Sequence, residues 1–185
     1  MDNQLQTIIA NYHKLCAYCD AIWQRARAAY PNEIACREGC GICCELQSVN
    51  RLEAHVIRAY IIDTADTKFL SDSVDSGSPH TCPFLRDQSC AVYPARPIIC
   101  RTHGLILRST EFAQSQAASC PYNFPSVHPS DVPTELAADV DLITKNLANL
   151  NLAFCMASNI DVKDETNNRV PLRDLAKRPL FPAST

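Results

Sequence analysis

Hydrophobic residues recur at helical spacing in three long stretches of the chain. In residues 3–30, apolar side chains return every three or four positions until Pro31 ends the pattern. The same spacing runs through residues 134–158, directly after Pro133, a residue that suits the first turn of a helix. We therefore predict a long helix in each of these two stretches.

The third helical pattern lies between them, at residues 51–65. Asn50 precedes it and Glu53 follows three positions later, which is the spacing of a capping signal at a helix N-terminus. The neighbouring segments lack such a period. Residues 32–49 contain glycines and cysteines, and residues 71–81 are polar and rich in turn-forming residues. We predict a helix at 51–65 with a loop on each side.

Residues 82–104 hold three prolines and three cysteines, so we expect irregular backbone there. The apolar segments 91–93 and 105–107 are compatible with short strands in a small two-stranded ribbon. The tail is mostly polar, but the apolar segment 170–172 is expected to pack back on the domain. The predicted fold is therefore mainly α, with helices around a cysteine-rich irregular centre and one short β-ribbon.

We expect a single domain over residues 1–185, because this length suits one hydrophobic core. Within it we distinguish a cysteine-cluster region at 33–122, the C-terminal helix at 134–158 and a polar tail at 159–185.

The composition is ordinary for a globular protein, with 46% hydrophobic and 20% charged residues. A net charge of −3 gives no reason to expect nucleic acid or an acidic membrane surface as a partner. The first residues lack the basic and apolar regions of a secretory signal, and no apolar run approaches the about 20 residues that span a bilayer. We expect a cytoplasmic protein that binds neither nucleic acid nor membranes.

Cysteine departs from this ordinary composition, because the chain has 11 cysteines. An odd number cannot pair completely in disulfides, and in a reducing cytosol clustered cysteines are more typical of metal or redox sites. Cys16, Cys19 and Cys155 lie inside helical patterns, where cysteine usually packs as a small hydrophobic side chain. The alternative for Cys16 and Cys19 is that they face the same centre as the loop cysteines.

The remaining cysteines lie in loop-like sequence, most of them near glycine or proline. Soft thiolates on backbone that can bend around an ion are the donors of zinc and iron–sulfur sites. Adjacent side chains tend to point apart, so the neighbouring pair Cys43 and Cys44 suggests more than one metal ion. The sequence predicts these thiolate ligands: Cys36, Cys40, Cys43, Cys44, Cys82, Cys90, Cys100 and Cys120.

Three further residues are predicted to lie beside the ligands. Arg96 and Arg101 flank Cys100 and can offset the negative charge of the thiolates, although each is also compatible with an ordinary surface cation. His103 follows Cys100 by three residues, and we interpret it as a neighbour of the ligands rather than a ligand.

Together these motifs resemble the bacterial CxxCxxCC, or YkgJ-like, family, described as a zinc- or iron-chelating domain. The resemblance covers residues 33–122 and rests on C-x3-C-x2-C-C at 36–44, C-P-F-L at 82–85 and C-x-V-Y-x-x-R-P-x-x-C-R at 90–101. It implies a zinc or iron centre and leaves the choice of metal open. A flagellin lysine-N-methylase is similar over the same cysteine motif, which implies that some relatives modify proteins.

Several functions fit this pattern. An iron–sulfur cluster is slightly favoured over zinc, because the loop thiolates exceed the four that one structural zinc ion requires. The alternatives are a metal-dependent protein-modifying enzyme, a metal storage or delivery protein, and a metal-free thiol redox protein. The spacing C-x3-C-x2-C also occurs in radical S-adenosylmethionine enzymes, but their alternating β/α pattern is not seen in this sequence. Whether the protein is catalytic, and its substrate or protein partner, stay open.

Overall fold

The computed structural model describes residues 2–64, 80–111, 120–161 and 169–177. The chain forms two compact units, which are described separately. Unit 1 comprises Met1–Arg37 and Pro97–Ser158, and unit 2 comprises Glu38–Arg96 and Asn159–Thr185. The fold is mainly α, as predicted, with five α-helices and only short strands within the described ranges.

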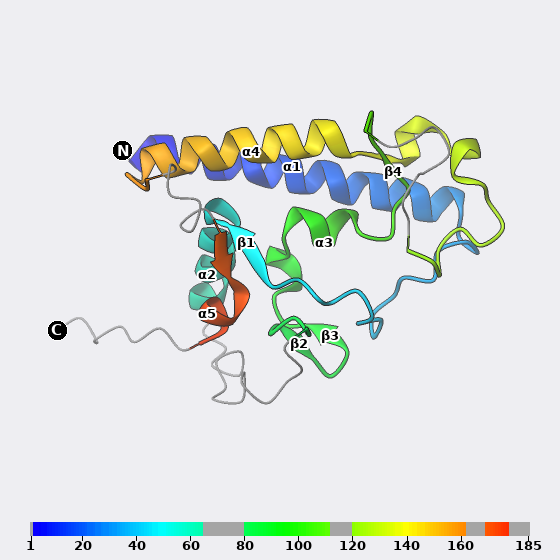
Figure 1. The fold of residues 1–185 in the computed structure, drawn as a ribbon, viewed down its shortest axis with the longest axis horizontal. Coiled ribbons are helices and arrows are strands. Elements are labelled where there is room, and N and C mark those ends of the chain that lie inside the picture. The colour runs from blue at the N-terminus through cyan, green and yellow to red at the C-terminus, as the bar shows by residue number, and fades with distance from the viewer. Residues whose placement is uncertain (1, 65–79, 112–119, 162–168, 178–185) are drawn as a thin grey trace. The chain divides into compact units, whose positions relative to one another are not determined.

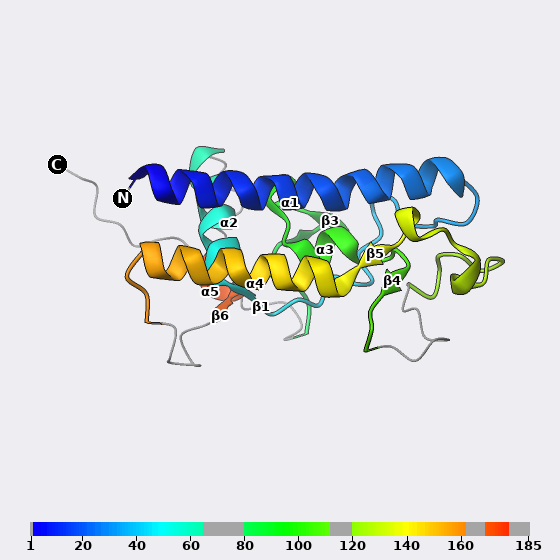
Figure 2. The same ribbon diagram turned by 90° about the horizontal axis from the view of Figure 1, so that it is seen from above.

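Two long helices, α1 (Asp2–Ala29) and α4 (Val140–Ala157), form the frame of unit 1. They lie side by side and run in opposite directions in both views (Figures 1 and 2). A short helix, α3 (Ile98–Thr102), also packs against α1. The apolar period of α1 explains this packing, because residues three or four apart share one face of a helix. The buried face of α1 consists of Ile8, Tyr12, Cys16, Cys19, Ile22 and Ala26.

The predicted start of the C-terminal helix at residue 134 is wrong by six residues. Strand β5 (Ala138–Asp139) pairs in parallel with β4 (Leu107–Arg108), so the chain is extended just before α4. Asp139 then caps the helix, its Oδ1 accepting a hydrogen bond from Leu142 N at 2.9 Å. The helical spacing of apolar residues extends back through residues 134–139. This stretch is nevertheless not part of the helix, because β5 pairs with the distant strand β4.

The predicted ribbon between segments 91–93 and 105–107 is also wrong. Strand β2 (Leu85–Arg86) instead pairs with β3 (Ser89–Cys90) in an antiparallel hairpin of unit 2. Asp87 and Gln88 form its two-residue turn, both with positive φ (46° and 63°), which is the geometry of a tight hairpin. Short 3₁₀ helices lie at Tyr93–Ala95 (η3), Pro129–Asp131 (η4) and Thr134–Leu136 (η5).

A second apolar cluster in unit 1 joins the end of α1 to the proline-rich segment before α4. The rings of Tyr30 and Phe124 meet edge to face, with centroids 5.7 Å apart. This cluster packs the segment that begins at Phe124 against the end of α1. Its buried members are Ile106, Phe124, Val132 and Ala137, with Tyr30, Ile34, Val127 and Leu136 packed against them.

In unit 2, α2 (Arg51–Asp63) follows directly on β1 (Ser48–Asn50). The predicted cap is confirmed: Glu53 N donates to Asn50 Oδ1, and Asn50 Nδ2 donates to Glu53 Oε2, each at 2.9 Å. Strand β6 (Arg169–Pro171) pairs antiparallel with β1 and leads into α5 (Leu172–Ala176).

The apolar segment of the tail therefore packs on unit 2, as predicted, and Leu172 is buried there. The predicted loop at 71–81 lies largely outside the described residues, as do parts of the tail. None of the helices in the described ranges is both long and apolar enough to cross a membrane.

Candidate metal centre

All eleven cysteines lie in described parts of the chain and are present as thiols, with no disulfide bond among them. Cys16, Cys19 and Cys155 are buried in unit 1, which agrees with their interpretation as core residues. The predicted ligands divide between the units. Unit 1 contains Cys36, Cys100 and Cys120, and unit 2 contains Cys40, Cys43, Cys44, Cys82 and Cys90.

Within the described residues, no three His, Cys, Asp or Glu side chains come close enough together to hold a metal ion. The structure does show how the backbone surrounds individual thiols. The hydrogen bonds and charges near each thiol indicate whether it suits a zinc or iron ligand.

Cys82 begins a tight turn in unit 2. Its backbone N–H donates to the carbonyl oxygen of Cys44 at 2.7 Å, which ties the first cysteine motif to the second. Leu85 N donates to the carbonyl oxygen of Cys82 at 3.1 Å and closes the turn. Burial raises the pKa of the Cys82 thiol, whereas hydrogen bonds from the backbone N–H groups of Phe84 and Leu85 and the nearby charge of Arg86 act in the opposite direction.

Cys90 lies opposite Leu85 in the β2–β3 hairpin. Burial raises the pKa of the Cys90 thiol, while a backbone hydrogen bond from Val92 and the positive charge of Arg96 lower it. Cys90 in turn contributes to the raised pKa of Cys82, so the two sulfurs interact electrostatically. A cation between such thiolates would relieve that repulsion, and N–H donors aimed at sulfur are a usual surrounding of thiolate ligands. This donor set fits zinc or iron.

The first cysteine motif of unit 2 rests on the same hairpin. A Cβ atom added to Gly41 would lie 2.9 Å from Gln88 Oε1 and 3.0 Å from Leu85 Cδ1, so only a glycine fits without displacement. The neighbouring thiols differ in exposure, since Cys43 is exposed and Cys44 is half-buried. Two motifs about forty residues apart in sequence are thus brought together in unit 2.

In unit 1, the loops that carry Cys36 and Cys120 are linked by Asn123. Its Nδ2 donates to Cys36 Sγ at 3.3 Å, and its backbone N–H donates to the carbonyl oxygen of Cys120 at 2.9 Å. Cys100 is exposed on α3. Sequence reasoning missed Asn123, because a single amide after a Cys-Pro pair has no spacing that points to a thiol.

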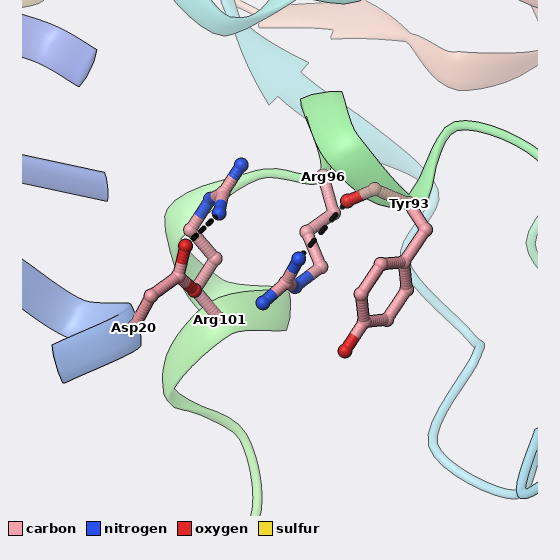
Figure 3. Close-up of polar contacts among 4 residues, drawn as sticks. All are labelled: Asp20, Tyr93, Arg96 and Arg101. Carbon is pink, nitrogen blue, oxygen red and sulfur yellow. Dashed lines mark hydrogen bonds and ion pairs between the residues drawn. The ribbon is translucent and has the colours of Figure 1, made fainter. Parts of the chain in front are cut away.

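The two predicted arginines have defined partners (Figure 3). In unit 1, Arg101 Nη1 lies 2.6 Å from Asp20 Oδ2 of α1, and Arg101 is only 5% exposed. In unit 2, Arg96 Nη1 donates to the carbonyl oxygen of Tyr93 at 3.0 Å and its guanidinium lies 4.0 Å from the centre of the Tyr93 ring. His103 is exposed just after α3.

The thiol of Cys19 in α1 is buried, unlike those of the loop cysteines, and its pKa is raised. Burial raises the pKa of Cys19 to about 12, and the nearby charges of Cys16 and Asp20 act in the same direction, whereas Arg101 lowers it. Cys19 is therefore a protonated thiol at neutral pH. That state suits a core position better than a ligand position.

Residues 35–121 match the family model CxxCxxCC, described as "Putative zinc- or iron-chelating domain". No curated protein and no solved structure matches the chain. The matched segment contains every predicted thiolate ligand, and α1 and α4 lie outside it. This match agrees with the resemblance predicted from the cysteine motifs, and it indicates that residues 35–121 are similar to a zinc- or iron-chelating domain.

Proposed function

We propose that this protein binds an iron–sulfur cluster through the thiolates of its loop cysteines. The observation that carries the proposal is the junction of two cysteine motifs in unit 2, where the N–H of Cys82 donates to the carbonyl oxygen of Cys44 at 2.7 Å inside the segment that matches the chelating family. The ligands are the loop cysteines predicted from the sequence: Cys36, Cys40, Cys43, Cys44, Cys82, Cys90, Cys100 and Cys120.

Iron–sulfur is favoured over zinc by the adjacent thiols of Cys43 and Cys44. Neighbouring side chains tend to point apart, which suits a centre with more than one metal ion better than a single closed zinc site with four ligands. When bound, such a cluster supplies one-electron chemistry, whose potential depends on hydrogen bonds and charges around the sulfurs. The N–H donors of Phe84, Leu85 and Val92 and the guanidinium of Arg96 would stabilise thiolate charge in unit 2.

The test is metal analysis of the full chain purified without oxygen. We expect iron and acid-labile sulfide in similar amounts and a visible absorption band that is lost on exposure to air. Colourless protein with stoichiometric zinc would refute the iron–sulfur proposal and leave a zinc site. Protein that takes up neither metal would refute both.

A second candidate is metal delivery, because the thiol of Cys43 is exposed. An exposed ligand can be reached by a competing chelator or by an acceptor protein. Delivery predicts that the loaded protein loses its metal to a chelator within minutes, whereas a resident cofactor should be retained for hours. Slow release that is unchanged in a Cys43→Ser variant would exclude this role.

A further inference from the structure

A buried asparagine contacts one of the proposed ligands in unit 1. Asn123 is 4% exposed, and its Nδ2 donates to Cys36 Sγ at 3.3 Å and to the carbonyl oxygen of Gly104 at 2.8 Å. Its Oδ1 accepts a hydrogen bond from the N–H of Ala35 at 2.9 Å. Both ends of the amide are therefore engaged, and one of the partners is a thiol.

The backbone next to this amide is held in an unusual conformation. Phe124 has a φ of +56°, in the left-handed region that a bulky side chain rarely adopts. Its N–H donates to the carbonyl oxygen of Glu33 at 2.6 Å, and its ring packs on Tyr30. Such conformations persist only where surrounding contacts maintain them, and they cluster at functional sites. Here the contacts of Phe124 with Glu33 and Tyr30 fix the position of Asn123 relative to the segment that carries Cys36.

Gly104 completes the surroundings of the Cys36 sulfur. Its φ is +92°, and an added Cβ atom would lie 2.9 Å from Asn123 Nδ2, 3.1 Å from Cys36 Sγ and 3.2 Å from Trp23 Cζ2. Only glycine permits both this conformation and this close approach. Three separate segments of unit 1 therefore meet around one thiol: the one after α1, the one after α3 and the one after Cys120.

We propose that Asn123 is a positioning residue, which orients the Cys36 thiolate for a metal ion. This inference rests on the proposed function, in which Cys36 is a ligand. Metal ligands are commonly held by a hydrogen bond to a neighbouring group, and loss of that group weakens metal binding by about 10- to 100-fold. An amide suits a thiolate, because it offers an N–H donor without adding charge. Asn123 lies beyond the segment that matches the chelating family, so the family motif does not include it.

The test compares Asn123→Asp with the wild-type chain. This variant keeps an oxygen that can accept from Ala35 N–H, but it replaces the Nδ2 donor to both Cys36 Sγ and the carbonyl oxygen of Gly104 with an oxygen that repels a thiolate. The matched control is Asn149→Asp, the same change at an exposed position of α4. Zinc affinity is measured on the metal-free full chain by competition with a chromogenic chelator, and cobalt(II) provides a spectrum of thiolate coordination.

We expect Asn123→Asp to bind zinc about 10- to 100-fold more weakly and to show a weaker thiolate-to-cobalt band. Asn149→Asp should match the wild type in both. A folded Asn123→Asp with wild-type affinity and spectrum would overturn the role of Asn123 and leave the proposed function intact. A wild-type chain that binds neither zinc nor iron would overturn the proposed function and this inference with it.

A measurement on the wild type covers the case in which Asn123→Asp does not fold. The side-chain amide protons of Asn123 give a separate signal in a ¹⁵N-correlated NMR spectrum. If the amide contacts a ligating sulfur, these protons should shift when zinc is added, while those of Asn149 should not. An unchanged Asn123 signal in zinc-loaded protein would overturn the inference.

Discussion

At the scale of single residues, burial separates the cysteines into two chemical kinds. Cys19 has no exposed surface, and its raised pKa of about 12 keeps it protonated at neutral pH. Cys43 is exposed. Because the thiolate is the nucleophile, these two thiols should differ strongly in reactivity.

We expect iodoacetamide to label Cys43 and to leave Cys19 unlabelled in the folded, metal-free protein at pH 8. Peptide mass spectrometry at successive times measures both rates in one sample. Unfolding in guanidinium is the control, because it should make both thiols react. Equal labelling of both in protein that keeps its circular dichroism spectrum would contradict the burial of Cys19.

Serine substitutions should divide the cysteines in the same way. Cys40→Ser and Cys100→Ser should lose bound metal and lower stability, because metal binding is coupled to folding. Cys155→Ser is the matched control for metal content, since Cys155 is buried in unit 1 and lies outside the segment that matches the chelating family. Elemental analysis of the purified variants measures the outcome. Full metal content in Cys40→Ser and Cys100→Ser would show that these two are not ligands.

The pair of Arg101 and Asp20 gives a prediction about stability. Asp20→Ala would leave the buried guanidinium of Arg101 without this carboxylate, and breaking a buried pair is strongly destabilising. Asp20 keeps a third of its side-chain surface exposed, so we expect a loss of about 2–3 kcal/mol rather than the full buried value. Urea unfolding measures it. The exposed Asp63→Ala serves as control and should change the free energy of unfolding by less than about 0.5 kcal/mol.

At the scale of elements, short capping interactions decide where the helices begin. Asn50 and Glu53 start α2 as their spacing predicts. At the start of α4, Asp139 caps the helix, and Asp141 accepts hydrogen bonds from Ser109 Oγ and from the N–H and hydroxyl of Thr110. These contacts join the first turn of α4 to the end of β4.

The role of Asp141 is expected to depend on pH. Hydrogen bonds from Ser109 and Thr110 lower the pKa of Asp141 below its ordinary value of 3.8. A carboxylate with a lowered pKa in the folded state stabilises the fold fully above the ordinary pKa, and this contribution is lost as the pH falls through the lowered value. Asp141→Asn should therefore be less stable than the wild type at pH 7, with a difference that shrinks below about pH 4.

Chemical unfolding of both proteins at several pH values between 7 and 2.5 measures this difference. Asp63→Asn is the control for the loss of one carboxylate that has none of these partners. A difference between wild type and Asp141→Asn that stays constant down to pH 2.5 would contradict the proposed role of the carboxylate.

At the scale of the whole molecule, the segment that matches the chelating family contributes residues to both compact units. Residues 35–37 and 97–121 of the matched segment belong to unit 1, and residues 38–96 belong to unit 2. A metal that binds only the native chain stabilises it by mass action, by about 4 kcal/mol when the free ion exceeds its dissociation constant a thousandfold.

We therefore expect removal of metal to lower the unfolding temperature of the protein. The measurement is differential scanning calorimetry of loaded protein and of protein treated with a chelator under reducing conditions. Restoring the metal should restore the unfolding temperature, which controls for damage by the chelator. Identical unfolding of loaded and metal-free protein would contradict coupling between metal and fold.

Local patterns were sufficient for much of this protein. The period of apolar residues predicted α1 and α2, because neighbours on a helix face are close in sequence. The cysteine motifs predicted the chelating family, since their types and spacings are themselves local. The buried cysteines of α1 and α4 were likewise separable from the loop cysteines by the patterns around them.

Tertiary structure decided what depends on segments far apart in sequence. The start of α4 follows from the pairing of Ala138–Asp139 with Leu107–Arg108, which no window around residue 134 contains. The contact between Asn123 and Cys36 joins residues 87 positions apart. A hydrogen bond of this kind exists only after the chain has folded, because folding brings the two residues together. The local sequence around either residue therefore does not predict it. The sequence by itself determined which atoms are available to bind a metal, and the fold determined which groups hold them.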